Sequence, residues 1–299
     1  MTSNPLFQAA AAAILSGVAF HASAGVVYAS NSNSLYTLDK TNGSATLVGS
    51  MLTAASGRAV IDMTAVGSTL YGLVQQQVGN VVQTNLAMID ANTAAVTDLP
   101  QISGIVTNSG PARRIDAIAY DATSGRMYGV NNGPDRSLYN IDLTTGAATF
   151  VGTLPSVSNQ NIQYRSLGFG AGGELFAALI TAGSNSASQL VRLDTTSAAQ
   201  TLLGASLSDT IADLAYDADD GVFYGGGTRT DATTGDLVST LLTINTLTGT
   251  AIEVSSGFAG GWNGLAVVPA AVPEPGTLLL TALAITGLLA GQRRKPAAP

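Results

Sequence analysis

The feature that most constrains the fold of this chain is a repeat. Five segments resemble one another: LYTLDKTNGSATLVG, LAMIDANTAAVTDLP, LYNIDLTTGAATFVG, LVRLDTTSAAQTLLG and LLTINTLTGTAIEVS. Each contains an acidic or amide residue, and these recur at spacings of 51, 52, 52 and 51 residues, at Asp39, Asp90, Asp142, Asp194 and Asn245. A fixed period near 50 residues in a strand-rich chain is typical of a propeller or a solenoid.

Each unit reads as four short antiparallel strands. The third unit runs RIDAIAYD, TSG, RMYGV, a variable loop, SLYNIDL, TTG and ATFVG, so Gly-containing turns separate apolar strands. Four such strands per unit are the pattern of a propeller blade. The composition agrees, because 10% charged residues and 34 Gly favour strands and turns over helices carrying ion pairs. The sequence therefore predicts an all-β fold.

The two ends of the repeat predict how the ring closes. The first unit begins at Gly25 and supplies three strands, without the opening strand that the other units have. The last unit is followed by GWNGLAVV, residues 261–268, which matches that missing strand. One blade would then combine three N-terminal strands with one C-terminal strand, which leaves no open sheet edge. We expect a five-bladed β-propeller over residues 25–269, with Trp262 near the seam.

The repeated acidic residues are expected to form turns. An Asp or Asn can accept backbone N–H bonds at the start of a turn, and after Asp39, Asp142 and Asn245 a Gly four residues later takes a positive φ. The acidic stretch Tyr216–Gly221 could suggest calcium, but it lacks the ligand spacing of a calcium loop. We therefore expect a hairpin turn there and no metal site.

Residues 1–24 are interpreted as a signal peptide. An apolar run of 12 residues, 9–20, precedes Ala22-Ser23-Ala24, the small-residue pattern that signal peptidase cleaves. The segment before that run has no Lys or Arg, which departs from the usual pattern. A buried N-terminal helix is the alternative interpretation.

Residues 270–299 have the composition of a membrane-stop tail. An uncharged run of 15 residues, 277–291, is followed by the basic residues Arg293, Arg294 and Lys295. Cations after an apolar segment keep that side in the cytoplasm, so the preceding chain would be outside. The run is shorter than the ~20 residues that span a bilayer comfortably, which argues against a plain permanent anchor.

The order Pro273-Glu274-Pro275, apolar segment and basic end resembles the PEP-CTERM sorting signal of Gram-negative bacteria. The resemblance implies recognition of these three residues by an exosortase after signal-peptide removal, with a transient stay in the inner membrane. It implies delivery to the cell envelope or the outside of bacteria that make exopolysaccharide. The middle of the chain is similar to propeller-like repeats of exported bacterial proteins whose units read LY.LDP.TG.AT.VG, which indicates an architecture and not a chemistry.

The first strand of each blade lines the central channel of a propeller, so polar residues there are the candidate site. They are Asp62, Asp116, Arg165, Asp213 and Asn263. In the alignment of the units Asp213 lies one residue later than the other four. These residues could bind a ligand, or they could form a structural ring of ion pairs and hydrogen bonds in a wet channel.

The residue inventory limits the chemistry. The chain has no Cys, and its one His, His21, lies in the expected signal peptide. A mature protein without either would have no Ser-His-Asp or Cys-His nucleophile and no His-ligated metal, and we expect no cofactor. A net charge of −7 with scattered cations argues against a nucleic-acid partner.

Two hypotheses of function remain. The first is a non-catalytic binding or structural propeller. In this hypothesis its partner is a surface polysaccharide, bound through polar loops at residues 75–84, 100–111, 155–163 and 228–236. The same loops could be solvated linkers. The second is a glycoside hydrolase or lyase that acts on exopolysaccharide with Asp62 and Asp116 as its carboxylate pair.

Overall fold

The computed structural model describes residues 25–105, 114–133, 135–155, 162–181, 188–259 and 261–270. Residues Gly25–Pro269 form one compact unit. The expected signal peptide, the Pro273-Glu274-Pro275 motif and the basic end lie outside the described residues. Within the described ranges, no helix has the length and apolar character that crossing a membrane requires.

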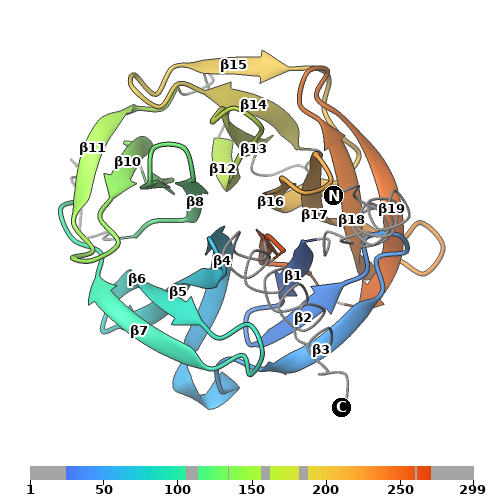
Figure 1. The fold of residues 1–299 in the computed structure, drawn as a ribbon, viewed down its shortest axis with the longest axis horizontal. Helices are drawn as coiled ribbons and strands as arrows, with labels where there is room; N and C mark the ends of the chain where they lie inside the picture. The colour runs from blue at the N-terminus through green and yellow to red at the C-terminus, as the bar shows by residue number, and fades with distance from the viewer. Residues whose placement is uncertain are drawn as a thin grey trace, which may run out of the picture. The chain divides into compact units, whose positions relative to one another are not determined.

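Five four-stranded antiparallel sheets surround a central axis as the blades of a propeller (Figure 1). Blade 1 has the order β20–β1–β2–β3 from the axis outward, and blades 2 to 5 each use four consecutive strands. In blades 2 to 5 the first strand, β4, β8, β12 or β16, is innermost. The five-bladed architecture predicted from the repeat is confirmed.

The strands have the following bounds. Blade 1 contains β1 (Val26–Ser30), β2 (Ser34–Leu38), β3 (Ala45–Ser50) and β20 (Gly264–Val268). Blade 2 contains β4 (Arg58–Val66), β5 (Thr69–Val78), β6 (Val81–Ile89) and β7 (Val96–Gln101), preceded by the short 3-10 helix η1 (Ala54–Ser56). Blade 3 contains β8 (Ala117–Asp121), β9 (Arg126–Asn131), β10 (Ser137–Ile141) and β11 (Ala148–Thr153). Blade 4 contains β12 (Ile162–Phe169), β13 (Leu175–Thr181), β14 (Gln189–Leu193) and β15 (Gln200–Leu203). Blade 5 contains β16 (Thr210–Asp217), β17 (Val222–Thr230), β18 (Leu237–Asn245) and β19 (Thr250–Ala259).

The ring closes as the sequence predicts. Strand β20 pairs antiparallel with β1, from Val26 opposite Val268 to Ser30 opposite Gly264. Trp262 lies at this seam, where its ring stacks on Phe258 with centroids 4.4 Å apart. Blade 1 thus joins the two ends of the propeller through backbone hydrogen bonds, so that neither β1 nor β20 is left as an exposed inner edge.

An ion pair also crosses the seam. Lys40, in the β2–β3 turn of blade 1, donates to Asp217 and to Asp220 of the β16–β17 turn of blade 5. The acidic stretch at Tyr216–Gly221 is therefore a hairpin turn, and its carboxylates serve a cation of the protein itself. In the described part of the chain there is no group of three or more potential metal ligands.

The repeated acidic residues form turns, as predicted. The Asp142 side chain accepts the backbone N–H of Thr144 at 2.9 Å and of Thr145 at 2.8 Å. Gly146 closes the turn with a φ of 72°. Asn245 makes the equivalent bonds to Leu247 and Thr248. Because these hydrogen bonds favour the ionised form, the pKa of the Asp142 carboxyl is lowered.

The apolar core is divided among the gaps between blades. Each of five buried clusters joins residues of two neighbouring blades. For example, Tyr128 and Val130 of blade 3 pack with Leu167 and Leu175 of blade 4. A single blade has one apolar face on each side of its sheet, so only the assembled ring buries both.

Two expected loops are partly strand. Residues 75–84 belong mostly to the long hairpin of β5 and β6, which turns at Gly79 with a φ of 60°. Residues 228–230 extend β17, so the connection to β18 begins only at Asp231. The polar residues of these segments are therefore held by backbone ladders, which the sequence interpretation as linkers did not anticipate.

Candidate functional site

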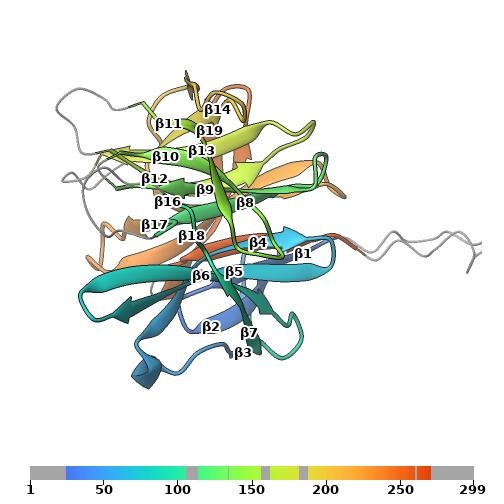
Figure 2. The same ribbon diagram turned by 90° about the vertical axis from the view of Figure 1, so that its left-hand side faces the viewer.

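The five innermost strands β4, β8, β12, β16 and β20 start at one face of the ring and end at the other. Figure 2 views the ring from the side and shows strands running between the two faces. The residues at their starts and at their ends line two separate cavities. Between these cavities lie two buried carboxyl groups, so the axis has three levels, each with its own chemistry.

The first level, here called the polar mouth, is a cavity of about 190 Å³ at the starts of the inner strands. All five blades contribute to it. Its lining residues are Ile61, Gln75, Arg114, Asp116, Asn132, Gln163, Arg165, Ala212, Trp262 and Asn263. A neighbouring hollow of about 420 Å³ shares Arg114, Asp116, Asn132 and Gln163 with it, so the polar mouth opens onto a wider surface.

One acidic residue lies in the polar mouth, and it already has partners. The Asp116 side chain is 8% exposed, forms an ion pair with Arg114 and accepts the backbone N–H of Asn132 at 2.7 Å. Burial raises the pKa of the Asp116 carboxyl above its ordinary value, while Arg114 and Arg165 oppose that rise. Asp116 therefore serves to hold Arg114 and the β9–β10 loop in place.

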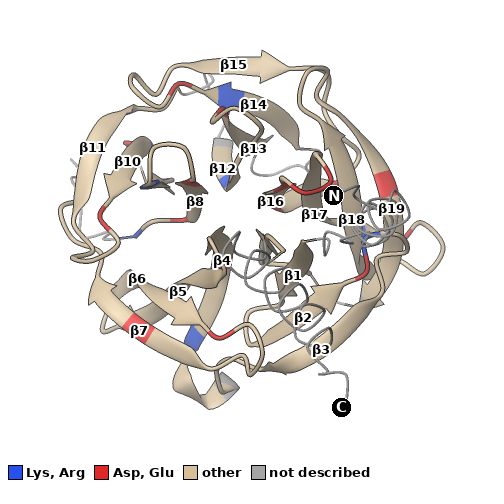
Figure 3. Cartoon of the chain, viewed as in Figure 1, with Lys and Arg blue, Asp and Glu red and all other residues tan. Residues whose placement is uncertain are grey.

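Arg165 is different, because its side chain is exposed in the polar mouth. Within the described ranges its guanidinium forms no ion pair or hydrogen bond. Figure 3 shows the corresponding basic section of β12 beside the axis. The polar mouth thus has two arginines and one aspartate, and only one arginine is paired.

A β-bulge explains the direction of Arg165. The register of β12 against β13 shifts between Tyr164 and Ser166, whose side chains are both completely buried. The extra residue between them is Arg165. A bulge turns its inserted residue out of the regular alternation, and here that residue is directed into the polar mouth. Strands β4 and β16 have the same shift, at Ile61 and at Ala212.

The bulges correct the alignment of the candidate residues. Residues Asp116, Arg165 and Asn263 share one level with Ile61 and Ala212 in the polar mouth. Asp62 lies one residue later, at the level of Asp213, and the sequence alignment that grouped Asp62 with Asp116 and Arg165 is wrong by one position. The similarity of Ile61-Asp62 to Ile115-Asp116 suggested the wrong register, because the two dipeptides are displaced by one residue in the structure.

The second level consists of Asp62 and Asp213, which are completely buried. Asp62 accepts the backbone N–H of Met63 at 2.9 Å and of Ile118 at 2.5 Å. Asp213 accepts the N–H of Leu214 at 2.7 Å and that of Leu265. These donors belong to four of the five inner strands, so the two carboxyl groups close the centre of the ring. The expectation that they line a wet channel is wrong.

The Asp62 and Asp213 carboxyl groups interact with each other, and the interaction changes the pKa of both. Burial raises the pKa of both groups, and the neighbouring Asp213 charge raises the pKa of Asp62 further. The hydrogen bond from Asp62 and those from the backbone favour the ionised form of Asp213. Asp62 therefore carries the proton and donates it toward Asp213.

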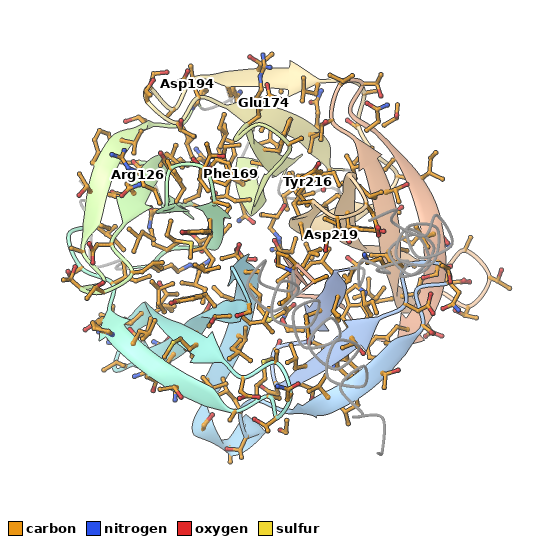
Figure 4. All side chains as sticks on the ribbon, viewed as in Figure 1. Arg126, Phe169, Glu174, Asp194, Tyr216 and Asp219 are labelled. Atoms are coloured by element: carbon orange, nitrogen blue, oxygen red, sulfur yellow. The ribbon has the colours of Figure 1, made fainter. Side chains whose placement is uncertain are left out.

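The third level, here called the apolar mouth, is a cavity of about 340 Å³ at the ends of the inner strands. Phe169 and Tyr216 line it, and Figure 4 shows them on β12 and β16 beside the axis. Small residues such as Ala215 and Gly168 leave the space between the strands open. A Cβ at Gly168 would lie 2.8 Å from the Leu214 Cβ, so β12 and β16 approach closely only because that residue is glycine.

The sequence analysis missed several residues of the polar mouth. Arg114 and Asn132 line it from positions just before or after strands, Gln163 lies near the start of β12, and Gln75 comes from the second strand of blade 2. The adjacent pair Arg113-Arg114 in an otherwise cation-poor chain is the one sequence signal that could have pointed to Arg114. The other three lie at positions that the repeat does not define.

One comparison with a solved structure supports the propeller fold. A structure titled Bacteroides ovatus xyloglucan PUL GH43B matches with a TM-score of 0.51 and 12% identity, over 84% of this chain and 54% of that chain. This chain therefore spans about half the length of that protein. A nidogen/laminin complex matches with a TM-score of 0.47 and 9% identity, over 82% of this chain and 98% of that one. A gluconolactonase from Xanthomonas campestris matches with a TM-score of 0.42 and 10% identity, over 68% and 65%.

At these identities the likeness is one of fold. No curated protein matches the sequence. A family model described as "Repeat of unknown function (DUF6923)" matches residues 105–264, which is more than half of the chain. The matched residues run from just before blade 3 to the first residue of β20, and so include three of the five blades. The chain belongs to this DUF6923 repeat family.

Proposed function

We propose that the protein is an exported, non-catalytic β-propeller that binds a polysaccharide of the cell envelope or extracellular matrix through its polar mouth. The observation that carries this proposal is the cavity itself. All five blades line it, and four of them supply amide, guanidinium or carboxyl groups whose positions the closed ring fixes. A rigid scaffold that places several hydrogen-bonding groups around one cavity is typical of a ligand site.

Sugars suit this lining. Their hydroxyl groups both donate and accept hydrogen bonds, and the side-chain amides of Gln75, Gln163 and Asn263 offer both functions. Trp262 lines the same cavity, and its ring is stacked on Phe258. A nucleic-acid partner would need a cluster of cations, and the chain has a net charge of −7.

The export part of the proposal depends on residues 1–24 and on the tail with Pro273, Glu274 and Pro275. The ends of the propeller are compatible with it. Val26 pairs with Val268, and Pro269 lines the apolar mouth, so the described chain enters and leaves the ring at the face of the apolar mouth. A tether that continues from residue 270 would start at the face opposite the polar mouth.

The glycosidase hypothesis has less support. That chemistry needs two carboxyl groups that reach opposite sides of one glycosidic bond. Asp62 is completely buried and bound by backbone N–H groups, whereas Asp116 lies in the polar mouth and is paired with Arg114. The two groups are at different levels of the axis. We therefore favour binding without turnover.

The test compares two matched substitutions. Ala212 lines the polar mouth and Ala218 lines the apolar mouth. We expect Ala212→Phe to fill the polar mouth and abolish capture of polysaccharide from the producing bacterium by the mature protein. Ala218→Phe adds the same side chain at the other face and should leave capture unchanged.

Two outcomes would contradict the proposal. Loss of capture in Ala218→Phe with retention in Ala212→Phe would place the ligand at the apolar mouth. Release of reducing sugars by the wild-type protein would contradict a non-catalytic role, and loss of that release in Asp116→Asn would favour the glycosidase hypothesis instead.

A further inference from the structure

We propose that the polar mouth is specific for an acidic sugar residue, a uronate, and that Arg165 is the partner of its carboxylate. This inference rests on the proposed function, because it names the class of ligand that the same cavity takes. It follows from which groups in the polar mouth are already satisfied and which remain available.

The first step concerns the charges. Arg114 and Asp116 satisfy each other, and Asp116 receives an additional N–H bond from Asn132. Arg165 is exposed and, among the residues that the structure describes, has no hydrogen-bonding partner. One positive charge is therefore left over in a cavity of a protein whose net charge is −7. An anionic group is the complement that this cavity lacks.

The second step concerns the rigidity of Arg165. Its neighbours Tyr164 and Ser166 are completely buried. The backbone N–H of Tyr164 donates to the Asn132 side chain at 2.8 Å, and the Asn132 amide donates back to the Tyr164 carbonyl at 2.9 Å. The bulge that projects Arg165 is thus fixed from both sides, and little backbone freedom would be lost when a ligand binds.

The third step concerns the neutral groups. Asn132 is occupied by Tyr164, and the Asn263 amide donates to Ser32, which leaves the Asn263 carbonyl oxygen available. In the described part of the chain the side-chain amides of Gln75 and Gln163 form no hydrogen bonds. Free amides beside a free guanidinium match a ligand that carries hydroxyl groups beside one anionic group, which is the chemistry of a uronic acid.

The fourth step concerns size and geometry. A cavity of about 190 Å³ is smaller than the roughly 300–1,000 Å³ of drug-sized pockets, as expected for one sugar ring. The adjoining hollow of about 420 Å³ gives the rest of a chain a path across the surface. A guanidinium can bind a carboxylate through two parallel N–H bonds, which gives specificity for planar carboxylate over other anions.

Trp262 provides the measurement. It is the one tryptophan of the chain, and it lines the polar mouth. Tryptophan fluorescence of the purified mature protein can therefore be titrated with trigalacturonate and with its methyl ester, which has the same ring and hydroxyl groups without the charge. We expect the acid to bind at least about tenfold more tightly than the ester, the factor for one charge-assisted hydrogen bond.

Substitution of Arg165 tests its role. Arg165→Gln should lower the affinity for trigalacturonate at least about tenfold and leave the affinity for the ester unchanged. Arg165→Lys keeps the charge and loses the paired geometry, so its affinity should be intermediate. Arg126→Gln is the control. Arg126 is another exposed arginine, at the start of β9 and outside the cavity, and its removal changes the net charge equally.

The outcomes separate this inference from the proposed function. Equal affinities for the acid and the ester would overturn the uronate inference. Equal losses of affinity for trigalacturonate in Arg165→Gln and Arg126→Gln would overturn it as well. If Ala212→Phe abolishes binding of the ester, the proposed binding function is still supported. Equal competition by acetate would show a simple anion site and overturn the sugar part. If neither probe produces a fluorescence or calorimetric response, the uronate inference is overturned. Continued polysaccharide capture by the same protein would still support the proposed function.

Discussion

At the scale of single residues, the two carboxyl groups at the axis determine how the centre of the ring is closed. Asp62 and Asp213 have no cationic partner in the described part of the chain, and backbone N–H groups from four inner strands surround them. A pair of buried carboxylates that were both ionised would repel strongly, so one proton is retained. The proton is thus a structural component that connects opposite sides of the ring.

This pair predicts an unusual pH dependence. A carboxyl group whose pKa is higher in the folded than in the unfolded protein stabilises the fold at low pH, and that stability is lost as pH rises above about 4. The loss is about 1.4 kcal/mol per pH unit for one retained proton. Asp62→Asn removes one of the two carboxyl groups whose pKa is raised, so urea unfolding between about pH 5 and about pH 8 should show a flatter slope.

Asp142→Asn is the matched control for that experiment. The pKa of Asp142 is lowered by its turn hydrogen bonds, so its contribution is present above the unfolded pKa and lost as pH falls below about 4. Asn245 shows that an amide forms the same turn. Asp142→Asn should therefore keep the slope at neutral pH, and parallel slopes for wild type and Asp62→Asn would disprove a retained proton at the axis.

The last position of the repeated motif is occupied by glycine for a steric reason. A Cβ at Gly152, in β11 of blade 3, would lie 2.7 Å from the carbonyl oxygen of Ser197 in a turn of blade 4. Gly49 is placed in the same way, 2.9 Å from the Thr93 oxygen of blade 2. The motif residue thus permits the turn of the next blade to pack on the outer strand.

We predict that Gly152→Ala lowers the free energy of unfolding by about 1–3 kcal/mol, as overpacking does in a close-packed site. Gly172→Ala is a less suitable control, because its positive φ adds strain of its own. Thr149→Ala in the same strand is better, since Thr149 is exposed and should cost less than about 0.5 kcal/mol. Chemical denaturation of the wild type, Gly152→Ala and Thr149→Ala measures these differences in the free energy of unfolding. Equal stability of Gly152→Ala and the wild type would contradict the prediction.

At the scale of elements, the repeat predicted the blades well because each unit depends on local signals. Alternating apolar residues and Asp-to-Gly turns define strands β9 to β11 within one unit, and the ends of the repeat define the β1–β20 closure. The inner strands were predicted less well. The dipeptide Ile61-Asp62 matches Ile115-Asp116 in sequence, but Ile61 and not Asp62 lies at the level of Asp116 and Arg165. Gln75 and Asn132 reach the polar mouth only through the assembled ring, which a single unit does not describe.

The closing strand gives the third prediction. Val267 of β20 is 7% exposed and packs in the cluster between blades 5 and 1, whereas Val26 of β1 is 39% exposed. Val267→Asp buries an unpaired charge where β20 closes the ring, so we expect a loss of more than about 3 kcal/mol. Val26→Asp makes the same change on the surface and should cost little.

The closure model also predicts the kind of failure. If β20 leaves the ring, the edge of β1 is exposed and can pair with another chain, so Val267→Asp should form oligomers in light scattering before it unfolds fully. If the Val267→Asp protein stays monomeric and unfolds at the same temperature as Val26→Asp, then β20 does not hold the ring closed.

At the scale of the whole molecule, the two ends of the described chain lie away from the candidate binding face. The described chain enters at Gly25 and leaves after Val268 on the side of the apolar mouth, while the polar mouth lies at the other ends of the inner strands. All five interblade clusters consist of residues within Gly25–Pro269. Removal of the chain beyond Pro269 would therefore take away no part of these cores.

The last prediction concerns processing at the two ends of the chain. We expect mass spectrometry of the mature protein to find an N-terminus at Gly25 and a C-terminus near Pro273-Glu274-Pro275, without Arg293. The physical basis is that Pro273 follows the end of β20 by five residues, so a cut at the motif leaves every strand of the ring intact. The cut protein should therefore unfold at the same temperature as the uncut one. Glu274→Ala should block processing and retain the basic end in the membrane fraction. A mature wild-type protein that keeps Arg293 would contradict the sorting hypothesis, and unfolding of the propeller after the cut would contradict the independence of its core.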